Sequence, residues 1–213
     1  MTIGRFVLAT TLALLAPAAA HAQQCGPEGV WATAAGGLSH YGTAGGTDAS
    51  ELGADLGFRL GTVAAEVSYR RVTPDVGRAD PDVARLRMAV PVTRLRGLGV
   101  CAVVHAGGSR FVADEDEGTV LAGGLGLRLE APLAGGAVLP FVEARGLGAT
   151  LTGELLGTDV SESGASLGGE VGIDAAAGPL VLRAAASLDG FDGGLGVTPY
   201  PDRLFRVAVG FRF

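Results

Sequence analysis

The sequence predicts an all-β protein, a single closed antiparallel up-and-down transmembrane β-barrel with ten strands preferred and eight as the alternative. Three observations lead to this fold class. Short segments alternate apolar and polar side chains with a period of two, which indicates strands. The connections between them alternate between short and long. The mean hydropathy is +0.38, yet the only long apolar stretch is N-terminal. Because only helices and closed barrels satisfy their backbone in lipid, a membrane location requires a barrel.

Residues 1–22 read as a cleaved secretory signal peptide of the Sec type. Arg5 precedes an apolar stretch over residues 6–15, and the segment ends Ala20-His21-Ala22, a small-x-small cleavage pattern. The stretch falls short of the ~20 residues that span a bilayer. Gln24 before Cys25 does not fit lipid attachment. We expect a periplasmic segment at residues 23–29 and the barrel at residues 30–213.

Ten segments of the remaining chain have the length and alternation of membrane strands. A tilted strand needs ~9 to 11 residues to cross a bilayer. An even number of strands places both termini of the chain on one side of the membrane, as in bacterial barrels. The predicted strands are residues 30–41, 51–60, 63–72, 83–92, 98–108, 119–130, 138–150, 165–174, 180–189 and 203–213. The eight-strand alternative arises because residues 32–37 and 184–186, rich in Gly and Ala, have a blurred period.

The connections between these strands fall into two classes. The short ones are residues 61–62, 93–97, 131–137 and 175–179, and the longer, more polar ones are 42–50, 73–82, 109–118, 151–164 and 190–202. In membrane barrels short turns face the periplasm and long loops face outward. A soluble β-sandwich has no reason to segregate loops in this way.

The last strand has one apolar face and one polar or small face. Phe205, Val207, Val209, Phe211 and Phe213 share the first, and Arg206, Ala208, Gly210 and Arg212 share the second. A terminal strand ending in Phe, on a chain with an export signal, resembles the small outer-membrane β-barrel proteins of Gram-negative bacteria. The resemblance implies an outer-membrane location. It also implies that Phe211 and Phe213 form the insertion signal read by the barrel-insertion machinery, and that the lipid partners are outer-membrane lipid and lipopolysaccharide.

Aromatic residues fall near the ends of the predicted strands, as expected for two interfacial belts. Trp31, Phe58, Phe141, Phe211 and Phe213 lie near periplasmic ends, and Tyr41, Tyr69, Phe111, Phe191, Tyr200 and Phe205 lie near or beyond outer ends. Their absence from the strand centres favours the membrane interpretation.

The faces opposite the aliphatic side chains carry charges of both signs, which predicts a paired network that fills the lumen. Unpaired buried charges are costly. A ten-stranded barrel is only slightly wider than the ~8-stranded size whose side chains fill it. The network is predicted to contain Asp55, Arg59, Glu66, Arg70, Arg85, Arg87, Arg128, Glu130, Glu143, Arg145, Glu170, Asp174, Arg183, Arg206 and Arg212, with His105 on the same face. A narrow water-filled path is the alternative.

Cys25 and Cys101 are the two cysteines, an even number in an exported chain, so a disulfide is one expectation. Both lie near the predicted periplasmic mouth, and a bridge would draw residues 23–28 across the barrel floor. The alternative is two separate thiols, because the neighbours of the first strand should be the second and the tenth.

The outer connections and the histidines supply the remaining site candidates. Asp114, Glu115, Asp116 and Glu117 are weak candidates for a Ca²⁺ or Mg²⁺ site, but without regular ligand spacing a solvated acidic loop is favoured. No metal or cofactor is expected.

Ser39 or Ser109 with His40 or His105 would be the components of a hydrolase, but no motif joins them, and no catalytic residue is assigned.

Net charge excludes one class of partner. Removal of Arg5 with the signal leaves 15 arginines against 22 acidic residues, a net charge of −7, which disfavours nucleic-acid binding.

Three functions follow in order of preference. The first is a structural or surface-interaction barrel, the second a porin-like narrow channel for ions or small solutes, and the third an outer-membrane lipid or peptide hydrolase. The sequence does not specify an oligomeric state.

Overall fold

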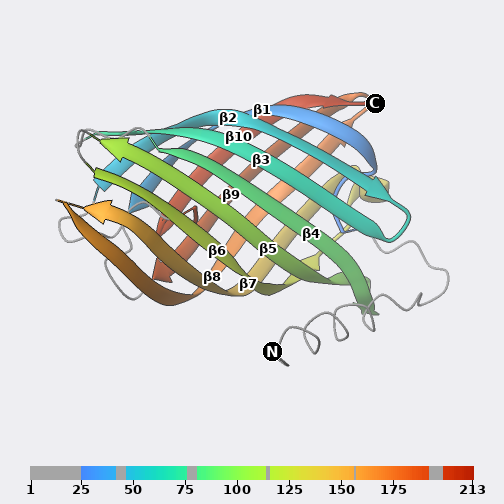
Figure 1. The fold of residues 1–213 in the computed structure, drawn as a ribbon. Helices are drawn as coiled ribbons and strands as arrows, with labels where there is room; N and C mark the ends of the chain where they lie inside the picture. The colour runs from blue at the N-terminus through green and yellow to red at the C-terminus, as the bar shows by residue number, and fades with distance from the viewer. Residues whose placement is uncertain (1–24, 42–46, 76–80, 114–115, 156, 192–198) are drawn as a thin grey trace.

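The computed structural model describes residues 25–41, 47–75, 81–113, 116–155, 157–191 and 199–213, and it is a closed ten-stranded antiparallel β-barrel (Figure 1). The predicted fold class and strand number are confirmed. The predicted signal peptide at residues 1–22 lies outside the described residues. The strands are β1 (Gly29–Tyr41), β2 (Thr47–Leu60), β3 (Val63–Pro74), β4 (Asp82–Leu95), β5 (Leu98–Ala113), β6 (Asp116–Glu130), β7 (Val138–Leu155), β8 (Thr158–Ala177), β9 (Leu180–Phe191) and β10 (Arg203–Arg212), with a short 3-10 turn η1 (Ala134–Gly136).

Each strand pairs with its sequence neighbours, and the barrel closes where β1 pairs with β10. That seam runs from Trp31 opposite Arg212 to His40 opposite Arg203. Gly210 allows the two backbones to approach, because a Cβ there would lie 1.9 Å from the carbonyl oxygen of Ala32. β2–β3, β4–β5, β6–β7 and β8–β9 turn at the end where the C-terminus lies (Figure 1). Among the described residues, no helix is long and apolar enough to cross a membrane.

Two of the predicted long loops are instead the ends of strand hairpins. β5 and β6 pair up to Ala113 opposite Asp116, and β7 and β8 pair up to Leu155 opposite Thr158. The predictions of loops at residues 109–118 and 151–164 were therefore wrong. Residues 109–118 contain four consecutive acidic residues, and residues 151–164 are rich in Gly, Ser and Thr, so neither segment resembled a membrane strand. Backbone pairing nevertheless continues above the apolar band.

The predicted connection at residues 93–97 was also too long. β4 continues to Leu95, and the turn consists of Arg96 and Gly97, whose φ angles of 49° and 90° are the left-handed values of a tight hairpin.

The outer face of the wall is aliphatic over a band of about nine residues per strand, the length of a tilted membrane strand. On β6, Leu121, Leu125, Leu127 and Leu129 are exposed outward, and on β10 the predicted face of Phe205, Val207, Val209, Phe211 and Phe213 is exposed. Exposed charged side chains begin beyond this band at the outer end, where Asp48, Arg71, Asp82, Arg110, Glu117 and Arg203 lie. This is the side-chain distribution of a barrel surrounded by lipid.

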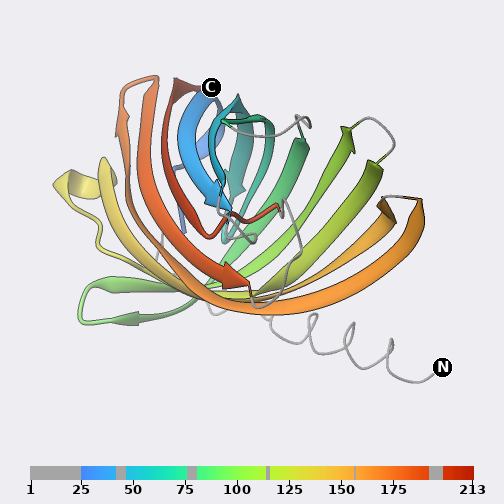
Figure 2. The same cartoon turned by 90° about the vertical axis from the view of Figure 1, so that its left-hand side faces the viewer.

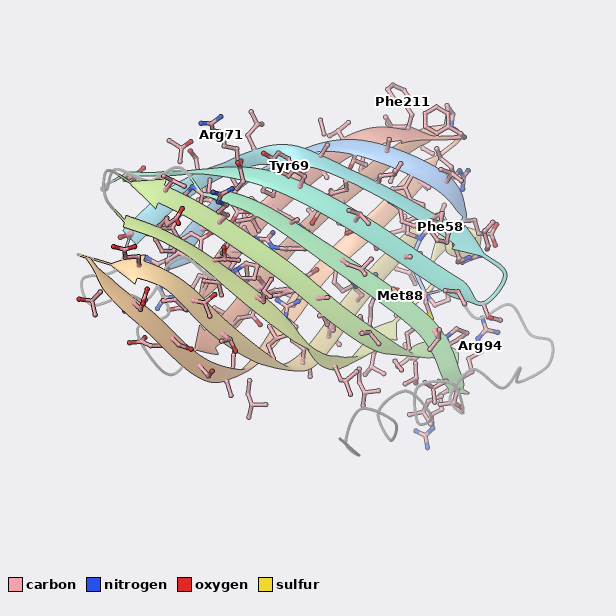
Figure 3. The ribbon with its side chains drawn as sticks, in the orientation of Figure 1. Phe58, Tyr69, Arg71, Met88, Arg94 and Phe211 are labelled. Atoms are coloured by element: carbon pink, nitrogen blue, oxygen red, sulfur yellow. A yellow bond between two sulfur atoms is a disulfide. The ribbon has the colours of Figure 1, made fainter. Side chains whose placement is uncertain are left out.

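The aromatic residues divide between the two faces instead of forming only outward belts. Phe58, Tyr69, Phe205, Phe211 and Phe213 are exposed, and Figure 3 shows Phe58 and Phe211 toward the end of the wall where the C-terminus lies. Trp31, Tyr41, Phe141 and Tyr200 are buried inside the barrel. Strand parity places the first three on the inner face, where glycines make room: a Cβ at Gly172 would lie 2.7 Å from the Phe141 ring.

Candidate functional site

The inner face of the barrel is the candidate site, because the charged side chains of most strands meet there. Strand alternation turns these side chains inward while their sequence neighbours face out. Of the predicted network, all but three members are buried; Arg59 and Arg212 lie at the end with the short turns, and Arg87 is half-buried. The network divides into two connected groups and a third set of two separate pairs.

The first group is a chain of ion pairs across the end that carries the short turns. Arg128 Nε donates to Glu130 Oε1 (2.5 Å) and Arg128 Nη2 to Asp174 Oδ2 (2.8 Å). Asp174 also accepts from Arg183 Nε (2.5 Å), and Arg183 pairs with Glu66. The Arg128 guanidinium lies 3.5 Å from the centroid of the Phe141 ring. Alternating signs let each buried charge offset the desolvation of its neighbours.

The second group is centred on Arg145 of β7. Its Nε donates to Asp189 Oδ1 (2.8 Å), and its Nη1 lies 3.3 Å from Glu170 and 3.5 Å from Glu143. Glu170 also accepts from Arg206 (3.3 Å). Each arginine thus faces at least one carboxylate.

Two further side chains approach Glu143 from β4 and β5. Arg87 Nη2 lies 3.5 Å from Glu143 Oε2, and His105 Nε2 lies 2.8 Å from Oε1. The second contact is close but poorly aligned for a hydrogen bond. Glu143 therefore joins two cationic or potentially cationic side chains to Arg145.

The third set lies toward the outer mouth. Arg85 lies 3.4 Å from Glu51, which also accepts a hydrogen bond from Tyr41 (3.1 Å). Arg70 pairs with Asp55, which accepts from Thr33 (3.0 Å).

A segment of the β9–β10 connection enters the barrel and fills its outer half. Pro199, Tyr200 and Pro201 are all buried. Arg85 donates to the carbonyl of Pro199, and the Tyr200 hydroxyl donates to the carbonyl of Ala106 (3.1 Å). Burial raises the pKa of the Tyr200 phenol to about 12, so it remains a donor at neutral pH.

Tyr200 separates the charged centre from an apolar region. Its ring is 5.5 Å from the Arg145 guanidinium on one side, and it packs with Val120, Leu147 and Leu151 on the other. Sequence reasoning placed Tyr200 in an outer belt, because a Pro-Tyr-Pro segment between strands carries no sign of facing inward.

The space left at the centre is a cavity of about 30 Å³ among Glu66, Arg87, His105, Glu170 and Arg206. A water molecule needs about 10–15 Å³ of such space, so the cavity holds a few waters. Arg87 Nε and Arg206 Nε have no protein acceptor among the described residues and are donors that such waters satisfy. The paired side chains and the Pro199–Pro201 segment thus fill the lumen.

The barrel floor is formed by the segment before β1. Cys25 is joined to Cys101 by a disulfide, which links this segment to β5 across the lumen. Gly26 N donates to Glu130 (3.3 Å), and its carbonyl accepts from Arg59 (3.1 Å), which also pairs with Glu28. Cys25, Gly26 and Pro27 are buried. Next to the floor is a vestibule of about 320 Å³ lined by Glu28, Leu139, Asp174 and Arg212, among others.

Two members of the interior network were not predicted. Glu51 shares the parity of Asp55 on β2, and Asp189 shares that of Arg183 on β9. Both are end residues of the predicted strands 51–60 and 180–189, and following the parity to those ends would have found them.

The other sequence candidates do not come together. Glu117 is exposed and lies 3.8 Å from Arg110, Asp114 and Glu115 lie outside the described residues, and nothing is described of the Asp116 side chain. No group of metal-ligating side chains occurs among the described residues.

The candidate hydrolase residues lie at different places on the wall. Ser39 is buried on the inner face of β1, whereas its neighbour His40 faces out and contacts Asp48 at 2.7 Å. Ser109 and His105 both face inward from β5, but three residues of extended strand lie between them.

No protein-family model and no curated protein matches the chain. Similar solved structures are small outer-membrane β-barrels of Gram-negative bacteria. Neisserial surface protein A is 14% identical, with 87% of this chain and 96% of that chain covered and a TM-score of 0.43. The translocator domain of autotransporter NalP from Neisseria meningitidis is 14% identical, with coverage of 99% and 94% and a TM-score of 0.41. Ail, the attachment invasion locus protein of Yersinia pestis, is 13% identical, with coverage of 88% and 100% and a TM-score of 0.32.

Proposed function

We propose that the protein is an integral outer-membrane barrel with a closed lumen and a structural or surface-interaction role. The observation that carries this proposal is the filled interior. Buried arginines and carboxylates pair across the lumen, and the central cavity of about 30 Å³ admits water but no solute. A conducting barrel of larger size keeps a continuous aqueous channel.

The outer-membrane location rests on the two faces of the wall. An aliphatic band of membrane thickness surrounds a charged interior, and the last strand ends in outward-facing Phe211 and Phe213. Residues 1–22 have the pattern of an export signal. We assign the end with the short turns to the periplasm and the opposite end to the exterior. Outer-membrane lipid, lipopolysaccharide and the insertion machinery are the proposed partners.

The proposed interaction surface is formed by the hairpins that rise above the aliphatic band. The outer ends of β7 and β8 expose polar side chains, and the hydroxyls of Thr150 and Ser163 lie 3.2 Å apart across the pair. The exposed polar side chains there are Thr150, Thr152, Glu154, Thr158, Asp159, Ser161, Glu162 and Ser163. A paired sheet presents these groups in fixed positions, as a recognition surface requires.

A narrow channel is the second candidate, favoured by the vestibule beside the floor. That space of about 320 Å³ leads toward the lumen and stops at the ion pairs of Asp174. Conduction would require the central pairs and the Pro199–Pro201 segment to move.

Planar-bilayer recordings of the folded barrel test the proposal. We expect no steady current from the wild type. Replacing Arg85 and Tyr200 by glycine removes the contacts that hold the Pro199–Pro201 segment and should produce channel openings. These openings would establish that the barrel inserts into the bilayer under the conditions of the recording. Steady ion-selective currents from the wild type would establish the channel instead.

Cysteine labelling of intact cells tests the assigned orientation. A membrane-impermeant maleimide should label Glu162→Cys and should not label Arg96→Cys, whereas both should react after lysis. Cys25 and Cys101 are already bonded to each other and do not interfere. The opposite labelling pattern would reverse the orientation.

A further inference from the structure

The hairpin between β4 and β5 extends beyond the β3–β4 ladder as a ribbon of residues 90–98, whose β5 strand stays paired with β6 from Gly99 onward. The β3–β4 ladder ends where Ala64 faces Ala89, whereas β4 and β5 remain paired up to Leu95 opposite Leu98. A bulge between Pro91 and Thr93 bends the ribbon. The end of β4 curves away from the wall in Figure 1, and the hairpin projects from the barrel outline in Figure 2.

The ribbon exposes both apolar and cationic side chains. Val92, Leu95 and Leu98 are 48%, 60% and 37% exposed. Arg94 and Arg96 flank Leu95 at the tip and are exposed, with no acidic partner among the described side chains, and Figure 3 shows Arg94 at this end of the barrel. One exposed hairpin tip therefore carries apolar and cationic side chains together.

The two ends of the barrel differ in charge. At the ribbon's end, Arg59 is paired with Glu28, and the carboxylate of Glu130 is buried against Arg128, which leaves Arg94 and Arg96 unneutralised. At the opposite end the exposed charges are mostly acidic: Asp48, Asp75, Asp82, Glu117, Glu154, Asp159 and Glu162, against Arg71, Arg110 and Arg203. The ribbon is therefore suited to a negatively charged surface with an apolar layer beneath it.

We propose that residues 90–98 form a binding site for anionic phospholipid headgroups in the periplasmic leaflet. Leu95 enters the boundary of the hydrocarbon, and Arg94 and Arg96 pair with lipid phosphates, which guanidinium groups bind through two parallel hydrogen bonds. This inference rests on the proposed orientation, which puts the ribbon at the periplasmic interface. A phospholipid supplies the phosphate and the apolar layer together, which an acidic protein surface does not.

Native mass spectrometry of the delipidated barrel in mixed micelles measures the selectivity directly. The probes are phosphatidylglycerol and phosphatidylcholine at equal concentrations. We expect the wild type to retain phosphatidylglycerol preferentially and R94Q/R96Q to reduce that preference by about 30-fold, from about 1 kcal/mol for each arginine near an anionic surface. R94K/R96K should keep part of the preference, because lysine retains the charge but not the two-point contact.

The matched control is R110Q/R203Q, which removes two exposed arginines from the opposite end. It should leave the preference unchanged. Leu95→Gln should weaken the retention of both lipids while preserving the ratio. Heat-dependent gel mobility establishes that each variant is folded before its lipids are counted.

Several outcomes would overturn the inference. One is a folded R94Q/R96Q variant with the wild-type preference, and another is an equal loss in R110Q/R203Q. A wild type without preference whose Arg96→Cys variant cross-links to a periplasmic protein would make the ribbon a protein-docking site. None of these results would contradict the proposal of a non-conducting barrel. Wild-type currents, or labelling of Arg96→Cys from outside the cell, would contradict the proposed function instead.

Discussion

The inner and outer faces of the barrel wall share the same strands but are stabilised by different interactions. On β6, Arg128 and Glu130 are fully buried inside, while Leu127 and Leu129 between and beside them face outward. The inner face depends on each charge having a partner, since an unpaired buried charge is costly. The outer face depends on the absence of charge, because its surroundings are lipid. Removing a charge from the inner face and adding one to the outer face should therefore both destabilise the barrel.

Removing a central charge should produce the largest effect. Arg145→Met leaves Asp189, Glu143 and Glu170 without their shared partner and should lower the unfolding free energy by about 3–5 kcal/mol. The matched change, Arg110→Met, removes an exposed arginine 3.8 Å from Glu117 and should cost less than about 1 kcal/mol. Urea unfolding of the two variants in phospholipid vesicles measures the difference, and equal midpoints would show that the interior pairs do not stabilise the fold.

Adding a charge to the outer face should have the next largest effect. Leu125 is 68% exposed in the middle of the aliphatic band, and Leu125→Arg should cost about 2–4 kcal/mol in a bilayer. Thr119→Arg, on the same face of β6 near the outer edge, should cost about 0–1 kcal/mol. The same vesicle assay applies. A cost that does not depend on depth would argue against the assigned lipid band.

Breaking the covalent link on the inner face should have a smaller effect. The Cys25→Ser/Cys101→Ser variant loses a bridge that spans 76 residues of sequence, and we expect a loss of about 2 kcal/mol, at the lower end of the usual range. Reduction of the wild type should reproduce the loss. Reduction of the double variant should change nothing, and a response there would mean that the reductant acts elsewhere.

Strand parity predicted which charged side chains face inward, but it did not predict which of them pair. It placed Asp55, Arg145 and Arg183 on the inner face, because alternation is a property of a single strand. It did not identify partners such as Glu66 and Arg183, which are 117 residues apart and meet only across the closed lumen. Such pairs depend on the curvature of the barrel and the stagger of its strands, which no local pattern contains.

Segments without an aliphatic face were the least predictable. Residues 151–164 looked like a loop because Ser, Thr and Gly outnumber aliphatic residues, although the β7–β8 ladder continues through them to Leu155 opposite Thr158. Trp31 and Phe141 were predicted near the correct end of the barrel but belong to the inner face. Their position along the strand indicated the interface, whereas their parity, which was not applied to these two residues, indicated the lumen.

The smallest predicted effect concerns Tyr200, where the inward segment meets the charged face. Tyr200→Phe removes the hydroxyl that donates to Ala106 and should lower the unfolding free energy by about 1 kcal/mol at pH 8. The pKa of this phenol is raised to about 12 in the folded protein, so its contribution is complete below the unfolded pKa of about 10 and is lost as the pH rises toward 12. The difference in unfolding free energy between the wild type and Tyr200→Phe should therefore disappear near about pH 11 in paired unfolding titrations. A difference that stays constant from pH 8 to pH 12 would mean that Tyr200 is not held in the interior, and that the outer half of the lumen is open.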